Sequence, residues 1–370
     1  MDDAYKDQGK TMVSVVVPAY NEESILKDNL RELCRYLKAL EDRHTWEIIV
    51  VNDGSTDKTG DIADAFALGA KNVKVLHHPY NFRLGQALRF AFSKCRGSYI
   101  VVMDADLSYS PSHIKKMLDK LYETHAKIVI ASPYAKGGKV SNVPWVRKTM
   151  SYWANRFLSF LATKDYYSEK LTNITGMVRA YDSIFLKQLN TNAMDVDINP
   201  EIIYKAKILR ARIVEVPAHL KWKKKQGKKR ESNLRIARSI MQSVLSGFIL
   251  RPFMFFVLPG LSLLALSLYP LFWTLYHTID KYMKFADLGG SVDHRLSEAM
   301  AAAFRLSPHA FIVGGVALVV AIQLLSLGLL AYQKKRYFQE LFHLGSMLHR
   351  NNLIHKEQID ILKALIVKNA

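Results

Sequence analysis

Short apolar runs alternate with helix-spaced segments over residues 1–220. Five runs dominated by β-branched and other apolar side chains predict strands, and they begin at Thr11, Trp46, Val73, Ser98 and Ala126. The segments between them place apolar side chains every three or four residues, as a helix with one buried face requires. This alternation predicts an α/β fold, with a doubly wound and mostly parallel sheet covered by helices on both faces.

A different pattern begins after residue 251. Residues 252–276 and 309–332 form two long apolar runs without Asp, Glu, Lys or Arg, and each is long enough to cross a bilayer as a helix. Basic residues precede the first run and follow the second, whereas the segment between the runs is balanced in charge. Because basic flanks stay on the cytoplasmic side, we expect a multi-pass hairpin (251–332) in the cell membrane. The N-terminal domain, the basic helical tail 333–370 and both termini are then expected in the cytoplasm.

Much of the net charge of +19 lies just before the first apolar run. The stretch KWKKKQGKKR starts at Lys221 and leads into a segment whose apolar side chains lie opposite Arg235 and Arg238. That pattern is typical of a basic linker followed by an amphipathic helix in the headgroup layer, so residues 221–250 are expected to contact the membrane surface. No helix-turn-helix pattern, zinc spacing or RNP-like motif accompanies the charge, so nucleic acid is not an expected partner.

Polar clusters follow three of the predicted strands: Pro18–Glu22, Asn52–Asp57 and Asp104–Asp106. The carboxyl ends of parallel strands meet at one edge of a sheet, so these clusters are expected to line one crevice. Asp104 and Asp106 would lie on the same side of an extended chain, and two carboxylates held together favour a cation between them. A Mg²⁺ or Mn²⁺ ion that bridges them to a diphosphate would meet that need; the alternative is that both aspartates only cap the strand end.

The residues of these clusters match a known pattern. VVVPAYNEE, VNDGSTDKT and VVMDADLSYSP, in this order, resemble the family 2 glycosyltransferases of GT-A fold, which take a sugar from a nucleotide diphosphate. The resemblance continues through SPYAKGGKVSNVPWVRKTMSYWANRFL, TNITGMVRAYD, NPEIIYKA and VEVP, and so spans roughly residues 12–235. It looks most like the branch that contains dolichol-phosphate mannose synthases and polyprenyl-phosphate glucosyltransferases, which implies a catalytic domain in residues 1–220.

The resemblance also implies a role for each matched residue. The nucleotide would contact Pro18, Tyr20, Glu22, Asp53 and Asp104. Asp104 and Asp106 would hold the metal ion, and together with Glu201, near the sugar or the acceptor, they would form the catalytic group. The phosphate of the acceptor would contact Arg147, Ser151, Lys136 and Lys148.

Three positions depart from the family pattern. Ser108 stands where the mannose synthases carry a glutamine near the metal, which leaves the third metal ligand open. Pro133 replaces an expected arginine, so a nearby lysine would have to supply that charge, and Asn173 occupies a place where relatives often have an aspartate. His77 and His78 match no site, and we expect both to be solvated loop residues.

The chemistry of the acceptor follows from the proton that it must lose. A hydroxyl loses its proton as it attacks and needs a positioned carboxylate, whereas a lipid phosphate already carries anionic oxygens at neutral pH. With Asn173 and many basic residues the chain fits a phosphate acceptor better, and Glu201 or Asp165 would be the base for a hydroxyl. We therefore expect a metal-dependent transferase that moves one sugar from a nucleotide sugar to a polyprenyl phosphate. The alternatives are a transferase acting on a lipid or glycan hydroxyl, or a non-catalytic membrane scaffold or carrier with a transferase-like domain. Association into homo-oligomers is compatible with two spans per chain.

Overall fold

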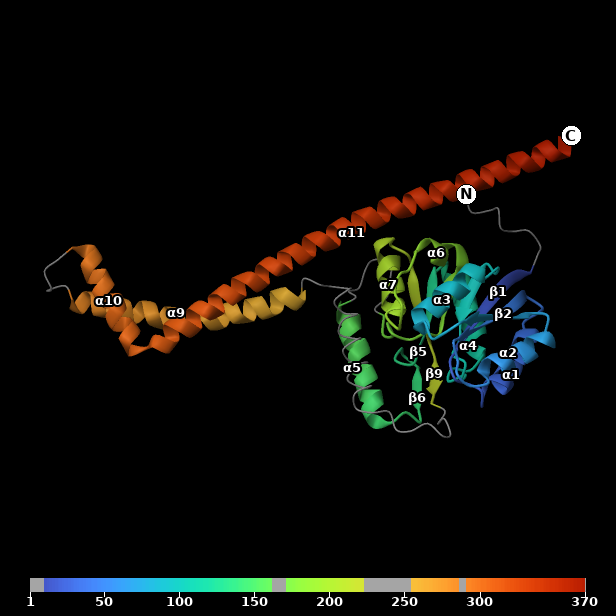
Figure 1. Ribbon diagram of the computed structural model, residues 1–370, viewed down its shortest axis with the longest axis horizontal. Helices are drawn as coiled ribbons and strands as arrows, with labels where there is room; N and C mark the ends of the chain where they lie inside the picture. Colours follow the sequence, from blue (N-terminus) through green and yellow to red (C-terminus); the bar gives the residue numbers. More distant parts are fainter. Residues whose placement is uncertain (1–9, 162–170, 223–253, 286–290, 370) are drawn as a thin grey trace. The chain divides into compact units, whose positions relative to one another are not determined.

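Figure 1 shows the computed structural model, which describes residues 10–161, 171–222, 254–285 and 291–369. The basic linker after residue 222 and the amphipathic helix expected before residue 251 therefore lie outside the described residues. The chain divides into two compact units, residues 1–250 with 342–370 and residues 251–341. The predicted boundaries at residues 221 and 333 stay predictions.

A seven-stranded sheet forms the centre of the first unit, in the order β3-β2-β1-β4-β7-β5-β8. Its strands are β1 (Thr11–Ala19), β2 (His44–Asp53), β3 (Val73–His78), β4 (Tyr99–Val102), β5 (Ile128–Ser132), β7 (Arg179–Asp182) and β8 (Ile213–Pro217). All neighbouring strands are parallel except that β7 runs antiparallel to both β4 and β5. A two-stranded parallel sheet joins β6 (Lys139–Ser141) to β9 (His219–Lys221). The predicted α/β class and the mostly parallel sheet are confirmed.

Helices cover both faces of the large sheet (Figure 1). They are α1 (Leu26–Lys38), α2 (Thr59–Leu68), α3 (Arg83–Lys94), α4 (Ser112–Thr124), α6 (Ser183–Gln188) and α7 (Ile198–Ile208). Helix α5 (Trp145–Leu161) lies beside the sheet instead, and its Asn155 Oδ1 accepts the Ile174 N–H at 2.9 Å. Alternate strand residues such as Val15 share one buried cluster with Leu30 of α1 and Met117 of α4. On the other face, Phe92 of α3 lies edge-on to Tyr181 of β7, with ring centroids 6.0 Å apart. Because strands of this sheet are buried on both faces, they read as nearly continuous apolar runs in the sequence.

The register of the strands brings the candidate site loops to one edge of the sheet. Ala19 pairs with Asn52 and Val16 pairs with Val102, so β1, β2 and β4 all end at this edge. Strand β7 begins there, because its first residue, Arg179, pairs with Val102 in the antiparallel direction. The loop that leads into β7 therefore joins the loops that follow β1, β2 and β4.

A buried carboxylate joins two strands and the turn that precedes β4. Glu47 of β2 accepts hydrogen bonds from Ser14 Oγ at 2.6 Å, from the Arg96 main-chain N–H at 2.8 Å and from Arg96 Nε at 2.9 Å. Burial raises the pKa of Glu47, but the hydrogen bonds from Ser14 and Arg96 and the charge of Arg96 outweigh burial and hold that pKa below its ordinary value. Glu47 is therefore a charged group at neutral pH that ties β1 to β2.

The second unit contains the apolar runs as helices, α9 (Met254–Lys284) and α11 (Pro308–Asn369), with α10 (Val292–Leu306) between them. By length and composition, α9 and residues Pro308–Leu348 of α11 are able to cross a membrane. A Cβ atom on Gly328 would lie 2.7 Å from Val257 Cγ2, so the absence of a side chain there lets α11 approach α9 closely. The two predicted spans are confirmed as candidate membrane helices, and both helices continue past the predicted ends at residues 276 and 332.

Candidate active site

The loops after β1 and β2 are joined by hydrogen bonds. The Asn21 main-chain N–H donates to Ser55 Oγ at 3.1 Å, and Asn21 Oδ1 accepts from the Thr56 N–H at 2.8 Å. The Glu22 N–H donates to Thr59 Oγ1 at 2.7 Å. Asn21 has a φ of 54°, a left-handed conformation that asparagine tolerates better than most residues. These motif residues therefore fix two loops as one piece before any ligand binds.

Asp53, at the end of β2, is buried and held by two hydrogen bonds. Its Oδ1 atom is 2.7 Å from His78 Nδ1 and accepts the Phe82 main-chain N–H at 3.0 Å. The preceding residue, Asn52, is 3.1 Å from His77 Nδ1 through its side-chain amide. Both histidines end β3 and are not loop residues, and the expectation of a solvated side chain is wrong for His78, which is 8% exposed. The contact between His78 and Asp53 arises because β2 pairs with β3, and no local signal in the sequence indicates that pairing.

The other residues predicted to contact the nucleotide lie near Asp53 at the same edge. Pro18 is half-buried and pairs with Val51 in the sheet, while Tyr20 is exposed and Glu22 is half-buried. These positions are compatible with a nucleoside pocket between the ends of β1 and β2. The nucleotide contacts themselves stay predictions.

Asp104 and Asp106 lie in a turn that follows β4, and both are half-buried. The prediction of an extended chain through Asp106 is wrong, because the chain turns and Leu107 adopts a φ of 46°. Ser108 closes the turn: its N–H donates to Asp106 Oδ1 at 2.9 Å, and its hydroxyl donates to Asp104 Oδ2 at 3.3 Å. Asn29 of α1 also supports the turn, since its amide donates to the Ala105 carbonyl at 2.8 Å. Asn29 is a residue that the motifs did not reveal.

The aspartate turn fits a hard divalent cation as part of a larger ligand set. Among the residues that the structure describes, no group of three or more His, Cys, Asp and Glu side chains could hold a metal ion. Asp104 and Asp106 offer only oxygen ligands, which Mg²⁺ and Mn²⁺ prefer, and such ions commonly complete their shell with substrate phosphates and water. The pair therefore fits a metal ion that arrives with a diphosphate, and the third protein ligand stays open.

A second polar network lies on the other side of β4. Glu215 of β8 accepts the N–H groups of Thr172 and Asn173, both at 2.8 Å, and the Thr172 hydroxyl at 2.6 Å. Burial raises the pKa of Glu215, and the hydrogen bonds offset this effect only in part. Both ends of the Asn173 side chain are engaged, since Nδ2 donates to the Ala131 carbonyl at 2.9 Å and Oδ1 accepts the Gly176 N–H at 3.0 Å. An aspartate at position 173 could not make the first of these bonds.

The residues predicted to bind the acceptor phosphate lie on α5 and on the loop after β5. Ser151 is half-buried, and Tyr134 donates its hydroxyl to Ser151 Oγ at 2.7 Å. Lys136 and Lys148 are both exposed. The side chain of Arg147 lies outside the described residues. Phosphate binding by these residues stays a prediction.

Glu201, predicted to be catalytic, lies in the first turn of α7. Its carboxylate accepts the N–H of Asn192 at 3.0 and 3.1 Å and the N–H of Ala193 at 2.8 Å, and it is 2.8 Å from Lys205 Nζ. These contacts hold the loop that precedes α7 onto α7. The same loop is joined to α3, where the Gln86 N–H donates to the Met194 carbonyl at 3.2 Å. Glu201 therefore forms an ion pair with Lys205, and a catalytic role for Glu201 stays a prediction.

Arg179 is a fully buried arginine beside the site. Its guanidinium donates to the carbonyls of Gly176 at 2.8 Å, Asn199 at 3.0 Å and Ile174 at 2.5 Å. These bonds tie the loop before β7 to the beginning of α7. Burial lowers the pKa of Arg179, but an arginine starts so high that it remains charged at neutral pH.

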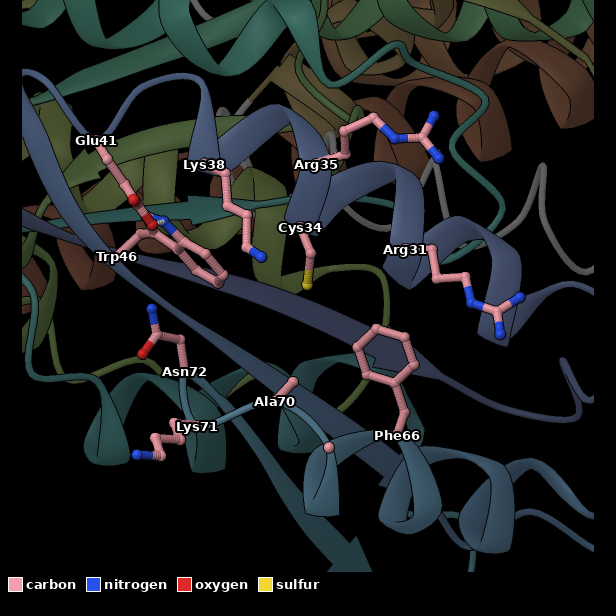
Figure 2. A pocket seen from close by; sticks show the side chains of 11 residues that line it. Arg31, Cys34, Arg35, Lys38, Glu41, Trp46, Phe66, Ala70, Lys71 and Asn72 are labelled. Carbon is pink, nitrogen blue, oxygen red and sulfur yellow. Dashed lines mark hydrogen bonds between the residues drawn. The ribbon is translucent and has the colours of Figure 1, made fainter.

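A groove of about 590 Å³ lies at the opposite edge of the sheet, between α1 and α2 (Figure 2). In Figure 2, the Cys34 thiol and the Phe66 ring point into it, and Trp46 lies near the beginning of β2. The lining residues include none of those predicted to bind substrate or metal. This groove is therefore distinct from the candidate active site.

Comparison with known proteins places the chain in a family. A family model described as Glycosyl transferase family 2 matches residues 14–189. An undecaprenyl-phosphate mannosyltransferase of Micrococcus luteus is 33% identical over 211 residues, which cover 55% of this chain and 82% of that protein. The chain therefore belongs to family 2 of the glycosyltransferases, and the resemblance noted in the sequence is confirmed.

Other relatives match over a smaller part of their length. A polyprenol monophosphomannose synthase of Mycolicibacterium smegmatis is 36% identical over 186 residues, covering 49% of this chain and 65% of the relative. A dolichyl-phosphate beta-glucosyltransferase of Trichomonas vaginalis is 28% identical over 229 residues, covering 60% and 69%. A solved mannosyltransferase of Pyrobaculum calidifontis, in complex with GDP-Man and Mn²⁺, overlaps 92% of this chain and 87% of its own, with 16% identity and a TM-score of 0.43. That structural likeness is too low to transfer the role of any residue.

Proposed function

We propose that this chain is a membrane-bound, metal-dependent hexosyltransferase that moves a single sugar from a UDP- or GDP-linked donor to dolichyl or undecaprenyl phosphate, with inversion at the anomeric carbon. Relatives named for dolichyl phosphate, polyprenol and undecaprenyl phosphate support this class of acceptor. The two candidate membrane helices support a lipid acceptor. The basic flanks of the apolar runs support a cytoplasmic catalytic domain and cytoplasmic termini.

The observation that carries this proposal is the turn with Asp104 and Asp106 at the end of β4. Strand β4 lies between β1 and β7, so the turn separates the Asp53 side of the site from the Glu215 side. The nucleoside would bind on the Asp53 side, and the sugar would meet the acceptor on the side of Ser151. Asp104 and Asp106 would hold the Mg²⁺ or Mn²⁺ ion with the diphosphate, and the ion would neutralise charge on that leaving group.

The acceptor side of the site supports a phosphate over a hydroxyl. A hydroxyl acceptor needs a carboxylate that can take its proton. Asp165 lies outside the described residues, and Glu215 and Glu201 are described carboxylates in this half of the domain. Each of them is already engaged by three hydrogen bonds from the main chain or from Thr172, and Glu201 also by Lys205. A lipid phosphate needs no such base, because its oxygens are anionic at neutral pH and positioning suffices.

The decisive experiment uses the full chain in lipid nanodiscs. It would be incubated with UDP- and GDP-linked sugars, dolichyl or undecaprenyl phosphate and Mg²⁺ or Mn²⁺, and the products weighed by mass spectrometry. We expect one sugar per lipid, joined by a phosphodiester that mild acid cleaves. Asp104→Asn and Asp106→Asn should each lower kcat/KM at least about 100-fold, whereas Asp119→Asn, a half-buried aspartate on α4 that pairs with Lys115, should leave it unchanged.

Other results would redirect the proposal. Full turnover in excess chelator would contradict the metal ion, and an acid-stable product would identify a hydroxyl acceptor. If calorimetry showed that the chain binds neither UDP nor GDP, with or without Mn²⁺, a non-catalytic scaffold or carrier would be the better reading. Sizing of the same nanodisc sample would test the predicted homo-oligomer.

A further inference from the structure

We propose that His78 is a positioning residue for nucleotide recognition: it holds the Asp53 carboxylate so that its second oxygen faces the nucleoside. This inference rests on the proposed function, since it assumes that Asp53 contacts the donor nucleotide. It assigns a role to a residue that belongs to none of the three strand-end clusters.

The hydrogen bonds at Asp53 define which atom is held. Oδ1 receives both described contacts, from His78 Nδ1 at 2.7 Å and from the Phe82 N–H at 3.0 Å. An ionised carboxylate can only accept, so the ring of His78 must carry its proton on Nδ1. Oδ2 accepts no hydrogen bond from the described residues, which leaves it for a base N–H or a ribose hydroxyl.

The ring of His78 is itself fixed by its neighbours. It stacks on Phe90 with centroids 5.3 Å apart and an angle of 25°, and it meets the edge of Phe82 at 4.9 Å. The side chain is only 8% exposed. Phe82 thus contacts both partners, since its ring packs on His78 and its main chain binds Asp53. A ring held in this way fixes the direction of its N–H, as a positioning residue requires.

The backbone around Asp53 is equally constrained. Gly54 has a φ of 62°, and a Cβ atom there would lie 2.1 Å from the Tyr80 carbonyl carbon, so the loop after β3 packs directly on this position. Arg83, a non-glycine residue, has a φ of 73° where α3 begins. Strained backbone of this kind persists only where the surrounding structure determines it. The loop from β3 to α3 therefore packs on Gly54 and donates the Phe82 N–H to the Asp53 carboxylate.

His77 offers a matched control on the same strand. It points to the other side of β3, as neighbouring strand residues do, and is 41% exposed. It also pairs with an aspartate, since its Nε2 is 3.0 Å from Asp64 Oδ1. A variant at His77 therefore removes a histidine–aspartate pair from β3, together with the contact to the Asn52 amide, and leaves both hydrogen bonds of Asp53 in place.

The test compares three variants of His78 in the full chain. His78→Phe keeps an aromatic ring but removes the donor, and we expect the KM for the nucleotide sugar to rise about tenfold with kcat within about threefold of the wild type. His78→Asn places an amide N–H where Nδ1 lies, so its KM should stay within about threefold of the wild-type value. His78→Gln has a longer side chain that places its amide away from the position of Nδ1, so its KM should stay raised. His77→Phe should change KM less than about twofold.

Two further measurements separate positioning from a loss of folding. Thermal unfolding identifies any variant that is not folded, in which case the comparison of His78→Asn with His78→Gln decides. In an Asp53→Asn background, His78→Phe should have no additional effect on the affinity for UDP or GDP, because the group that it orients is already changed. Additive losses in the double variant would overturn the inference.

The outcomes also distinguish this inference from the proposed function. If the wild type binds neither UDP nor GDP, the proposed function fails and the inference falls with it. If the wild type binds and transfers, and folded His78→Phe has a wild-type KM, the inference alone is overturned. Equal KM values for His78→Asn and His78→Gln would overturn the inference as well, since the position of the N–H donor would then not affect nucleotide binding.

Discussion

Replacing the buried Arg179 should lower the free energy of unfolding of the domain more than replacing an arginine on its surface. In Arg179→Met, a side chain of similar length and shape replaces the guanidinium. The carbonyls of Ile174, Gly176 and Asn199 then lose a donor that lies between 2.5 and 3.0 Å from each of them. Glu215 also loses the neighbouring positive charge that favours its ionised form.

The size of the effect follows from two opposing contributions. Each buried carbonyl left without a donor costs about 1–3 kcal/mol, so three of them could cost several kcal/mol together. Removing the guanidinium also removes the desolvation penalty of a buried charge, which favours the variant, and methionine retains the apolar contacts of the stem. We therefore expect a net loss of about 3–5 kcal/mol, as is typical when one partner of a buried charged network is removed. That is a large fraction of the free energy of about 5–15 kcal/mol that stabilises a typical domain.

Urea denaturation of the full chain in detergent, followed by tryptophan fluorescence, would measure the free energy of unfolding. Arg212→Met is the matched control, because Arg212 also donates to a main-chain carbonyl, that of Thr124 at 2.9 Å, but is exposed. The control should lose less than about 0.5 kcal/mol. A loss below about 1 kcal/mol for Arg179→Met, or an equal loss in both variants, would refute the argument that the three buried carbonyls depend on this guanidinium.

Three further predictions concern single polar side chains. Tyr134→Phe removes the donor to Ser151 and should raise the KM for the lipid phosphate about three- to tenfold in a transfer assay; an unchanged KM would separate this pair from the acceptor site. Asn29→Ala removes the donor to the turn that holds both aspartates and should weaken Mn²⁺-dependent turnover about tenfold, with wild-type Mn²⁺ dependence as the contrary result. Folding lowers the pKa of Glu47. Its contribution to folding stability is therefore fully present above the pKa of the unfolded state and is lost as the pH falls through the lower pKa of the folded state. Glu47→Gln should therefore lower stability at pH 7 and flatten its decline under acid, which urea midpoints at pH 7 and pH 3 would show.

The pattern of apolar residues was enough to predict the sheet, because each parallel strand is a local run whose burial on both faces is visible in the sequence. The three strand-end clusters could be placed at one edge for the same reason. The direction of β7 could not be predicted, since RAYD is only four residues long and its antiparallel pairing depends on partners far away in the chain. Short strands carry too little pattern to define their neighbours.

The side chains that support the site were harder to predict than those at its centre. His78 reaches Asp53 across 25 positions of sequence, and Glu215 reaches Thr172 across 43. Such contacts depend on strand register and loop path, which no local motif records. The same limit applies to Glu201 only in part. Its ion pair with Lys205 is one helical turn away and is visible in the sequence, whereas its bonds to the preceding loop depend on how that loop folds back.

The hydrogen bonds that join Asn21 and Glu22 to Ser55, Thr56 and Thr59 have a consequence for protein engineering. A chimera that receives only one of these two loops from another family member would inherit donors without their acceptors. Grafts that exchange both loops together keep the set of hydrogen bonds intact, so the two loops should be transferred only as a pair.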